Sequence, residues 1–248
     1  MILNGEQGDR PPLDWEAIDL VVFDVDGTLY SQSRLRRIMF GRLIADAWAS
    51  RSLRTINTLR VFRQIRESLG NQPNADFLTQ QYQQTAGRCQ VSVDEVRRLT
   101  SDWLEQRPLP FLTGCRYPHL EALFFALRTG GKRVAVFSDY PAVEKVSALG
   151  LQAWPIVCAT DDEVARLKPD PAGLLRILNQ SGVHPNRALM IGDRFDRDGL
   201  AARRANVRAL IRSRRVHPEF ETFQGFDDAI FAPLLHAATD GGRGLGVG

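Results

Sequence analysis

The sequence predicts an α/β fold, in which a doubly wound parallel sheet carries an inserted all-helical domain. Three observations predict this fold. The apolar run at residues 18–23 ends in closely spaced carboxylates. About eighty residues with helical patterns follow this run. From Pro118 onward, helical and strand-like segments alternate, which is typical of a Rossmann-like parallel sheet with helices on both faces.

The first strand is predicted at residues 18–23, because this segment is nearly all apolar, as a strand buried on both faces should be. It leads directly into the sequence DVDGT at residues 24–28. Side chains two positions apart on an extended chain point the same way, so the carboxylates of Asp24 and Asp26 can face one site. A surface turn at Asp-Gly is the structural alternative, but the apolar strand before it favours a reaction site.

The inserted region is predicted to be a helical cap domain. Apolar residues at helical spacing predict four helices, at about 35–47, 53–69, 75–86 and 92–104. Ser92 and Glu95 form a capping box at the start of the last helix, and Pro108 and Pro110 are predicted to stop it. The predicted domains are residues 31–113 for the cap and residues 1–30 with 114–248 for the sheet. A small helical bundle at this place would lie over the sheet edge as a substrate lid.

The second half of the chain is predicted to complete the sheet. The strands are predicted at residues 133–137, 156–159, 188–191 and 207–211, and the helices near residues 119–128, 141–150, 171–180 and 199–204. Glycines and prolines at the ends of these segments support the boundaries. The glycine-rich end, residues 240–248, is predicted to be disordered.

Polar motifs accompany these later elements. They are Ser138-Asp139 after a strand, Lys168-Pro169 before a helix, and Gly192-Asp193 after a strand, with Asp196 and Asp198 close behind. Ligands of doubly wound folds bind beyond the carboxyl ends of the strands, so these motifs are expected to meet there. In chain order, strand-DxDGT, strand-Ser, Lys-Pro and strand-GD-x4-D resemble the haloacid dehalogenase-like hydrolase superfamily. The resemblance covers residues 18 to 213 and is to the helical-cap phosphatase branch, which is phosphoglycolate phosphatase-like.

The resemblance implies a role for each acid of the first motif. Asp24 would be the nucleophile that forms an aspartyl-phosphate intermediate. Asp26 would be the general acid that protonates the leaving alcohol and then the base that activates water. Mg²⁺ would be the cofactor, with the Asp24 carboxylate, the Asp26 main-chain carbonyl and Asp193 as its ligands. Asp198 matches the second acidic position of the family and would hold a metal-bound water or orient Lys168.

The resemblance also implies the groups that bind phosphate. Lys168 would place a positive charge against the phosphate and the nucleophile. Ser138 and Thr28 would donate hydrogen bonds to the phosphate. One position departs from the family, because Asp139 stands where many relatives carry asparagine. Asp139 is expected to cap the helix that Pro141 starts, and Asp196 is expected to cap the helix that follows it.

Composition restricts the classes of protein and substrate. Nine arginines lie between Ser31 and Gly70 against two acids, which favours either an anionic substrate or well-solvated helices. Aromatic residues are not interleaved with them, so nucleic-acid binding is not expected. Three widely spaced cysteines suit a reducing cytoplasm. No signal peptide or membrane span is expected, so the sequence predicts a cytoplasmic enzyme.

The function predicted is a Mg²⁺-dependent phosphatase that hydrolyses a small phosphate monoester with an anionic group beyond the phosphate. A dehalogenase is disfavoured, because that branch lacks the second acid and Asp26 is present. The alternatives are a phosphomutase of the same superfamily and, with less support, a non-catalytic binding protein. The substrate and the oligomeric state stay open.

Overall fold

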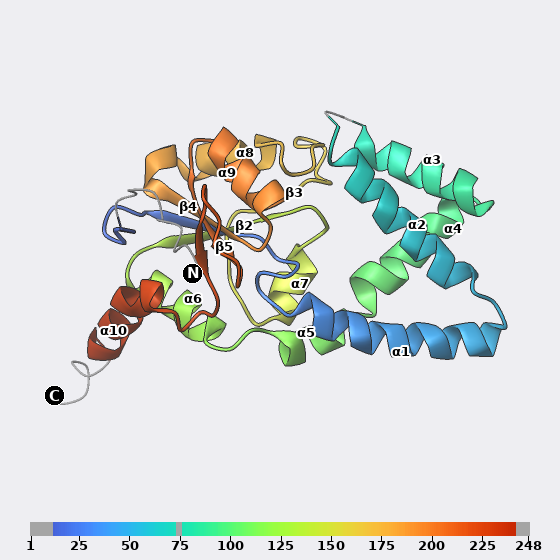
Figure 1. Cartoon of the computed structure of the whole chain (residues 1–248), viewed down its shortest axis with the longest axis horizontal. Helices are drawn as coiled ribbons and strands as arrows, with labels where there is room; N and C mark the ends of the chain where they lie inside the picture. Colours follow the sequence, from blue (N-terminus) through green and yellow to red (C-terminus); the bar gives the residue numbers. More distant parts are fainter. Residues whose placement is uncertain (1–11, 73–75, 242–248) are drawn as a thin grey trace, which may run out of the picture.

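The structure is a computed structural model that describes residues 12–72 and 76–241. Six parallel strands form one sheet in the order β3-β2-β1-β4-β5-β6 (Figure 1). Their bounds are Leu20–Phe23 (β1), Arg133–Ser138 (β2), Ile156–Cys158 (β3), Ala188–Gly192 (β4), Arg208–Arg212 (β5) and Glu221–Phe223 (β6). The predicted fold class is therefore confirmed. The sequence patterns did not indicate β6.

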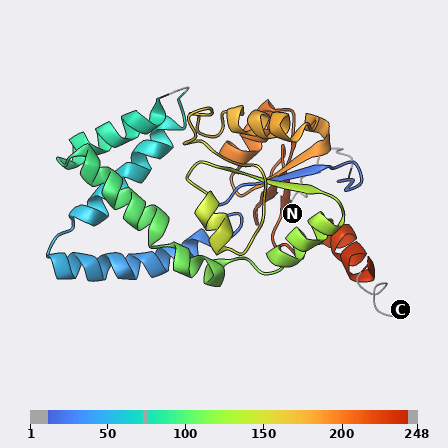
Figure 2. The ribbon, with the colours of Figure 1, turned by 180° about the vertical axis from the view of Figure 1, so that it is seen from behind.

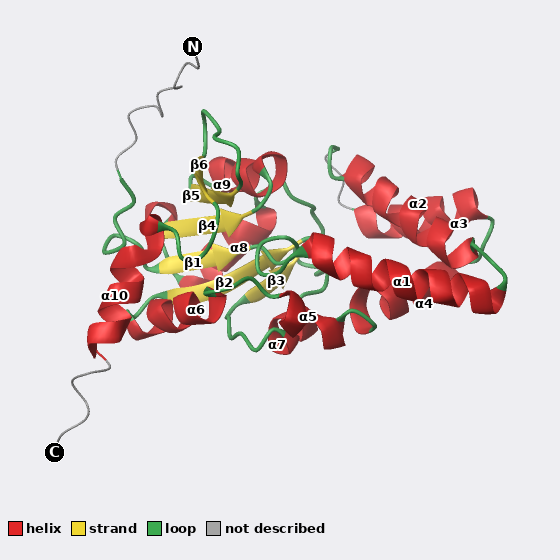
Figure 3. Ribbon diagram, turned by 60° about the horizontal axis from the view of Figure 1, so that its bottom comes forward, coloured by secondary structure: helices red, strands yellow, loops and turns green. Residues whose placement is uncertain are grey.

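Strand β1 lies inside the sheet, paired with β2 on one edge and β4 on the other, and both of its faces are buried. Leu20 and Val22 pack into one apolar cluster, while Val21 and Phe23 pack into another on the opposite face. The helices α6 (Leu120–Thr129) and α10 (Ala232–Gly241) lie on one side of the sheet, and α8 (Ala172–Ser181) and α9 (Leu200–Arg204) lie on the other (Figure 3). A strand covered on both faces is nearly all apolar, which is why the sequence revealed β1.

The strand order reverses beside β1. The chain goes outward from β1 through β2 to β3, and then crosses back so that β4 lies on the other side of β1. Phe23, the last residue of β1, is in register with Ile191 of β4. The residues that follow these two strands are therefore neighbours, at the place where doubly wound sheets bind their ligands.

The inserted region is helical, and it extends from one side of the sheet domain (Figures 1 and 2). Its elements are α1 (Gln32–Ser50), α2 (Arg54–Leu69), α3 (Phe77–Cys89), α4 (Val93–Thr100) and a π-helix at Ser101–Gln106. The capping prediction for α4 is confirmed on one side, since Ser92 Oγ accepts a hydrogen bond from the Glu95 N–H at 3.1 Å. Pro108 and Pro110 end this segment, but they also begin a further helix, α5 (Leu109–Cys115), which was not predicted.

Two further predictions concern the ends of helices. Helix α7 occupies Val143–Ala148 and is shorter than the predicted helix at 141–150. Helix α10 continues to Gly241, so most of the segment predicted to be disordered lies outside the described residues. Within residues 12–72 and 76–241, we find no helix that is both long and apolar enough to cross a membrane.

Candidate active site

The site begins where β1 and β4 end. The backbone N–H of Asp24 donates to the Ile191 carbonyl at 2.9 Å, so the two strands stay paired up to the first acid. Gly27 then turns the chain with φ +105°, and a Cβ atom at this position would lie 2.1 Å from Oδ2 of Asp193. Glycine is needed here both for the backbone conformation and for the close approach of Asp193.

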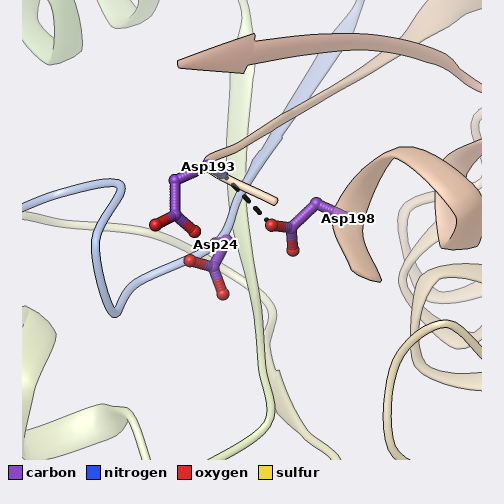
Figure 4. Close-up of side chains that lie close together, drawn as sticks. All are labelled: Asp24, Asp193 and Asp198. Carbon is purple, nitrogen blue, oxygen red and sulfur yellow. Dashed lines mark hydrogen bonds between the residues drawn. The ribbon is translucent and has the colours of Figure 1, made fainter. Parts of the chain in front are cut away.

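Three carboxylates converge at this point. One oxygen each from Asp24, Asp193 and Asp198 lies within 4.8 Å of the others, and Figure 4 shows the three side chains around one small space. One lysine, Lys168, makes ion pairs within this group, at 2.5 Å to Asp24 and 2.6 Å to Asp198. Three ionised carboxylates and one ammonium leave the cluster short of positive charge.

The pKa shifts of these acids reflect the same shortage of positive charge. Burial, with the charges of Asp198 and Asp193, raises the pKa of Asp24 well above its ordinary value, although Lys168 acts in the opposite direction. Burial and the neighbouring Asp198 raise the pKa of Asp193 to about 7. Within the described residues, the Asp193 carboxylate accepts no hydrogen bond. A divalent cation with oxygen ligands, such as Mg²⁺, fits this donor set and would supply the missing charge.

Asp198 differs from the other two acids because its oxygens already have donors. Its Oδ1 accepts from Lys168 Nζ, and its Oδ2 accepts from the backbone N–H groups of Asp193 at 3.2 Å and Arg194 at 3.0 Å. Of the two roles predicted for Asp198, this geometry favours the orientation of Lys168. The expected cap at Asp196 is wrong, because the N–H groups of Asp198 and Gly199 donate to the Arg194 carbonyl at 3.0 and 3.1 Å. The Asp196 carboxylate pairs instead with the Arg194 side chain at 2.9 Å.

Lys168 is the most deeply buried cation of the site, with an exposed fraction of 2%. Burial opposes its charge, but Asp198 and Asp24 outweigh burial and raise the pKa of Lys168 above its ordinary value. Its backbone N–H donates to Asp139 Oδ1 at 2.9 Å. The prediction that Asp139 caps the next helix is therefore wrong, since α7 begins only at Val143 and has no side-chain cap.

Asp26 faces a different set of partners. Lys145 Nζ donates to its two carboxylate oxygens at 2.8 and 2.9 Å, and the Tyr30 hydroxyl donates to Oδ1. Burial opposes ionisation, but Lys145 and Tyr30 outweigh it, so the pKa of Asp26 is lower than that of an ordinary aspartate. Asp24 and Asp26 thus have opposite pKa shifts in the metal-free site: the pKa of Asp24 is raised and that of Asp26 is lowered.

Sequence reasoning missed Lys145 and Tyr30. The signal for Lys145 was weak: it lies three residues after Ala142 and four before Leu149, both buried, so it falls on the apolar face of its helix. A lysine in such a position needs a partner with negative charge. Only the tertiary structure, in which α7 packs near the loop after β1, reveals that this partner is Asp26.

The two predicted phosphate-binding hydroxyls both lie at this edge of the sheet. Thr28 Oγ1 donates to Asp24 Oδ2 at 2.9 Å, so its proton is already used. Ser138, the last residue of β2, accepts from the Tyr140 N–H at 3.2 Å and keeps its own hydroxyl proton for another acceptor. Phosphate binding by these two residues stays a prediction.

A cavity of about 900 Å³ opens in front of these groups. It is lined on the sheet side by Asp24, Asp26, Lys168 and Asp193, among others. Residues of α1, α2 and the π-helix at Ser101–Gln106 also line it, and these three segments all belong to the inserted region. The clustered carboxylates and the inserted helices therefore line one shared space.

A family model for haloacid dehalogenase-like hydrolases matches residues 18–206. The chain belongs to this family. It is 31% identical over 200 residues to a phosphoglycolate phosphatase of Rhodospirillum rubrum, covering 78% of each chain. It is 27% identical to a glyceraldehyde 3-phosphate phosphatase of Methanopyrus kandleri, covering 80% of this chain and 84% of that one. The predicted family and its phosphoglycolate phosphatase-like branch are thus confirmed, and with them the enzyme class of phosphoric monoester hydrolases.

Solved structures of the family share the fold. The hydrolase YfnB from Bacillus subtilis superposes with a TM-score of 0.62 at 12% identity, over 88% of this chain and 98% of that chain. A β-phosphoglucomutase from Clostridium difficile gives 0.60 at 14% identity, over 91% and 99%. At these identities the likeness concerns the fold alone.

Proposed function

We propose that this haloacid dehalogenase-like hydrolase cleaves a small phosphate monoester through an aspartyl-phosphate formed on Asp24, with Mg²⁺ as its cofactor. The observation that carries the proposal is the cluster of Asp24, Asp193 and Asp198, in which three carboxylates face the single ammonium group of Lys168. Relatives of similar length that hydrolyse phosphoglycolate and glyceraldehyde 3-phosphate support it.

In the first step, a carboxylate oxygen of Asp24 attacks the phosphorus atom, and the bond from phosphorus to the leaving oxygen breaks. Asp26 gives its proton to that oxygen. Lys145 and Tyr30 hold Asp26 as a carboxylate in the resting site, and the charge of an incoming phosphate would raise its pKa so that it takes up this proton from solvent before the first turnover. In later turnovers, the proton that Asp26 takes from water in the second step serves the next first step.

In the second step, Asp26 takes a proton from water, and the water oxygen attacks the phosphorus of the aspartyl-phosphate. Inorganic phosphate leaves, and Asp24 returns to its carboxylate form. Lys168 stabilises charge on the phosphoryl oxygens in both steps, since its Nζ already lies 2.5 Å from Asp24. Ser138 and the backbone N–H groups of the loop after β1 would donate to the same oxygens.

Asp24, Asp193 and the main-chain carbonyl of Asp26 would hold Mg²⁺, which supplies positive charge against the phosphate oxygens. Asp198 would orient Lys168. The choice of Mg²⁺ follows from the oxygen donors and from the predominance of carboxylates.

The inserted domain at residues 31–113 would act as the lid and read the rest of the substrate. Arg36 and Arg63 line the cavity, and within the described residues neither has a hydrogen-bond or ion-pair partner. Arg63 is exposed, and partial desolvation of its guanidinium lowers its pKa. Arg66, in contrast, is used within the protein, because it donates to Gln81 and to the Asp139 carbonyl. We therefore propose that Arg36 and Arg63 bind a second anionic group on the substrate.

The test of the reaction is phosphate release from p-nitrophenyl phosphate and from a panel of metabolite phosphates. Turnover should require Mg²⁺, stop with a chelator, and be absent in Asp24→Asn. Silence of the folded protein towards the whole panel would contradict a phosphatase. If a sugar bisphosphate primer then produced isomerisation of a sugar phosphate, the enzyme would be a phosphomutase.

The second anionic group has a separate test. Arg63→Gln should raise KM for carboxylated phosphates and leave KM for p-nitrophenyl phosphate nearly unchanged. Arg60→Gln is the matched control, because Arg60 lies on the same helix, is exposed, does not line the cavity and donates to Asn57. Equal effects of both variants would contradict a direct role for Arg63.

A further inference from the structure

One stretch of the cavity wall is apolar. It is formed by side chains from three helical segments: Met39, Phe40 and Leu43 on α1, Leu59 on α2, and Trp103 and Leu104 on the π-helix. The polar groups that would bind phosphate lie at the opposite end, on the sheet. One cavity therefore combines charged groups of the sheet with an apolar stretch and arginines of the inserted helices.

Part of this wall is accessible. Phe40 is 59% exposed, although it lines the cavity, and Leu43 and Leu104 are half-buried. Leu59 and Trp103 behind them are almost completely buried and fix the shape of the wall. The apolar surface that these side chains leave exposed in the cavity gains free energy when a ligand displaces water from it.

The size of the cavity also favours a substrate with a large group beyond the phosphate. A volume of about 900 Å³ is near the upper end for pockets that enclose a ligand of drug size. A phosphate with a two-carbon or three-carbon acid would fill a small part of it. Because the wall continues directly into the space around Asp24 and Asp26, the occupant that fits is the part of the substrate beyond the phosphate.

We infer that the preferred substrate is a phosphate monoester with a bulky apolar leaving group, such as an aryl or a long or branched alkyl alcohol. This inference rests on the proposed phosphatase function. The phosphate would lie among Asp24, Lys168 and Asp193, and the apolar body would lie against Phe40, Leu43 and Leu104. An anionic substituent at the rim would meet Arg36 and Arg63.

The test is a series of n-alkyl phosphates, from ethyl through butyl to hexyl phosphate. Their leaving alcohols have nearly the same pKa, so the series changes apolar area and little else. If the wall binds the chain, kcat/KM should rise about fourfold for each added methylene group, as for the burial of a CH₂ group. Phe40→Ser and Leu104→Gln should each flatten this rise.

Trp48→Ser is the matched control, because Trp48 lies on α1 two turns beyond Phe40 and is 86% exposed, but it does not line the cavity. It should leave the dependence on chain length unchanged. Turnover that requires Mg²⁺ and Asp24 but does not rise with chain length would overturn this inference and leave the phosphatase intact. A rise that survives Phe40→Ser and Leu104→Gln would also overturn it. Failure to cleave any member of the series or of the metabolite panel would overturn the proposed function, and this inference with it.

Discussion

Arg197 donates from Nη1 to the backbone carbonyl of Lys168 at 2.9 Å. Its Nη2 donates to the Glu67 carbonyl and to Asn71 Oδ1, both at 3.0 Å, where α2 ends. The approach is possible because Gly70 has no side chain, since a Cβ atom there would lie 2.4 Å from Nη1. One buried guanidinium thus connects the inserted helical region to the lysine at the centre of the site.

We expect Arg197→Met to lower kcat on the order of tenfold to a hundredfold and to change KM little, as for other residues that orient a functional group. Without Arg197, the carbonyl of Lys168 loses its donor, and the distance from Nζ to Asp24 is no longer fixed. The control is Arg194→Met, because Arg194 binds Glu67 at 2.8 and 3.1 Å and has no hydrogen bond to Lys168. If both variants lost activity equally, Arg197 would only attach the two domains to each other. Steady-state kinetics with p-nitrophenyl phosphate decide between the two roles.

Lys145→Met should remove the charge that holds Asp26 in place. We expect kcat for alkyl phosphates to fall about a hundredfold, within the range for general acid–base catalysis. The loss for p-nitrophenyl phosphate should be smaller, because nitrophenolate leaves without a proton. Lys145→Arg should recover part of the activity. An equal loss for both substrates would show that Lys145 does not act through Asp26.

Gly27→Ala should destabilise the fold and displace Asp193. The residue would keep φ near +105° and place Cβ 2.1 Å from Asp193 Oδ2, so we expect a loss of about 1–3 kcal/mol in the free energy of unfolding. Mg²⁺ should then no longer raise the Tm. Gly131→Ala is the matched control, because Gly131 has φ +70° and open space around its Cβ position. It should cost about 1 kcal/mol and leave the effect of Mg²⁺ intact. Urea unfolding and thermal melts with and without Mg²⁺ measure both variants.

The effect of Mg²⁺ on stability should depend on pH. In the metal-free protein, burial and Asp198 raise the pKa of Asp193 from 3.8 to about 7. The folded protein therefore keeps a proton that the unfolded chain releases, so the stability from this group is complete below about pH 4 and is lost as the pH rises through 7. Mg²⁺ needs the carboxylate form. Its stabilising effect should be small at about pH 5.5 and grow up to about pH 8.

Thermal melts across this range, with and without Mg²⁺, measure the difference in Tm. Asp193→Asn should remove most of the growth with pH, because the amide neither titrates nor supplies a charged ligand. A Tm difference of the same size at every pH would show that no group near pH 7 competes with the metal.

The local patterns of the sequence were sufficient for the central part of the fold. Residues 18–23 are apolar because β1 is buried on both faces, and the acids after β1 and β4 follow where apolar character ends. Short peripheral elements were not predictable in this way. The strand β6 has only three residues, two of them half-buried, so its sequence carries no clear period.

The sequence by itself determined which residues reach the carboxyl edge of the sheet: Asp24, Asp26, Ser138, Lys168 and Asp193 follow strands or precede a helix in a fixed order. Only the tertiary structure decided how these groups are paired. Lys145 against Asp26, Asp139 against the backbone of Lys168 and Arg197 between Lys168 and Glu67 join segments separated by 29 to 130 positions in the chain. Such pairs depend on how helices pack, because a charged side chain carries no sequence signal for the distant group that neutralises it.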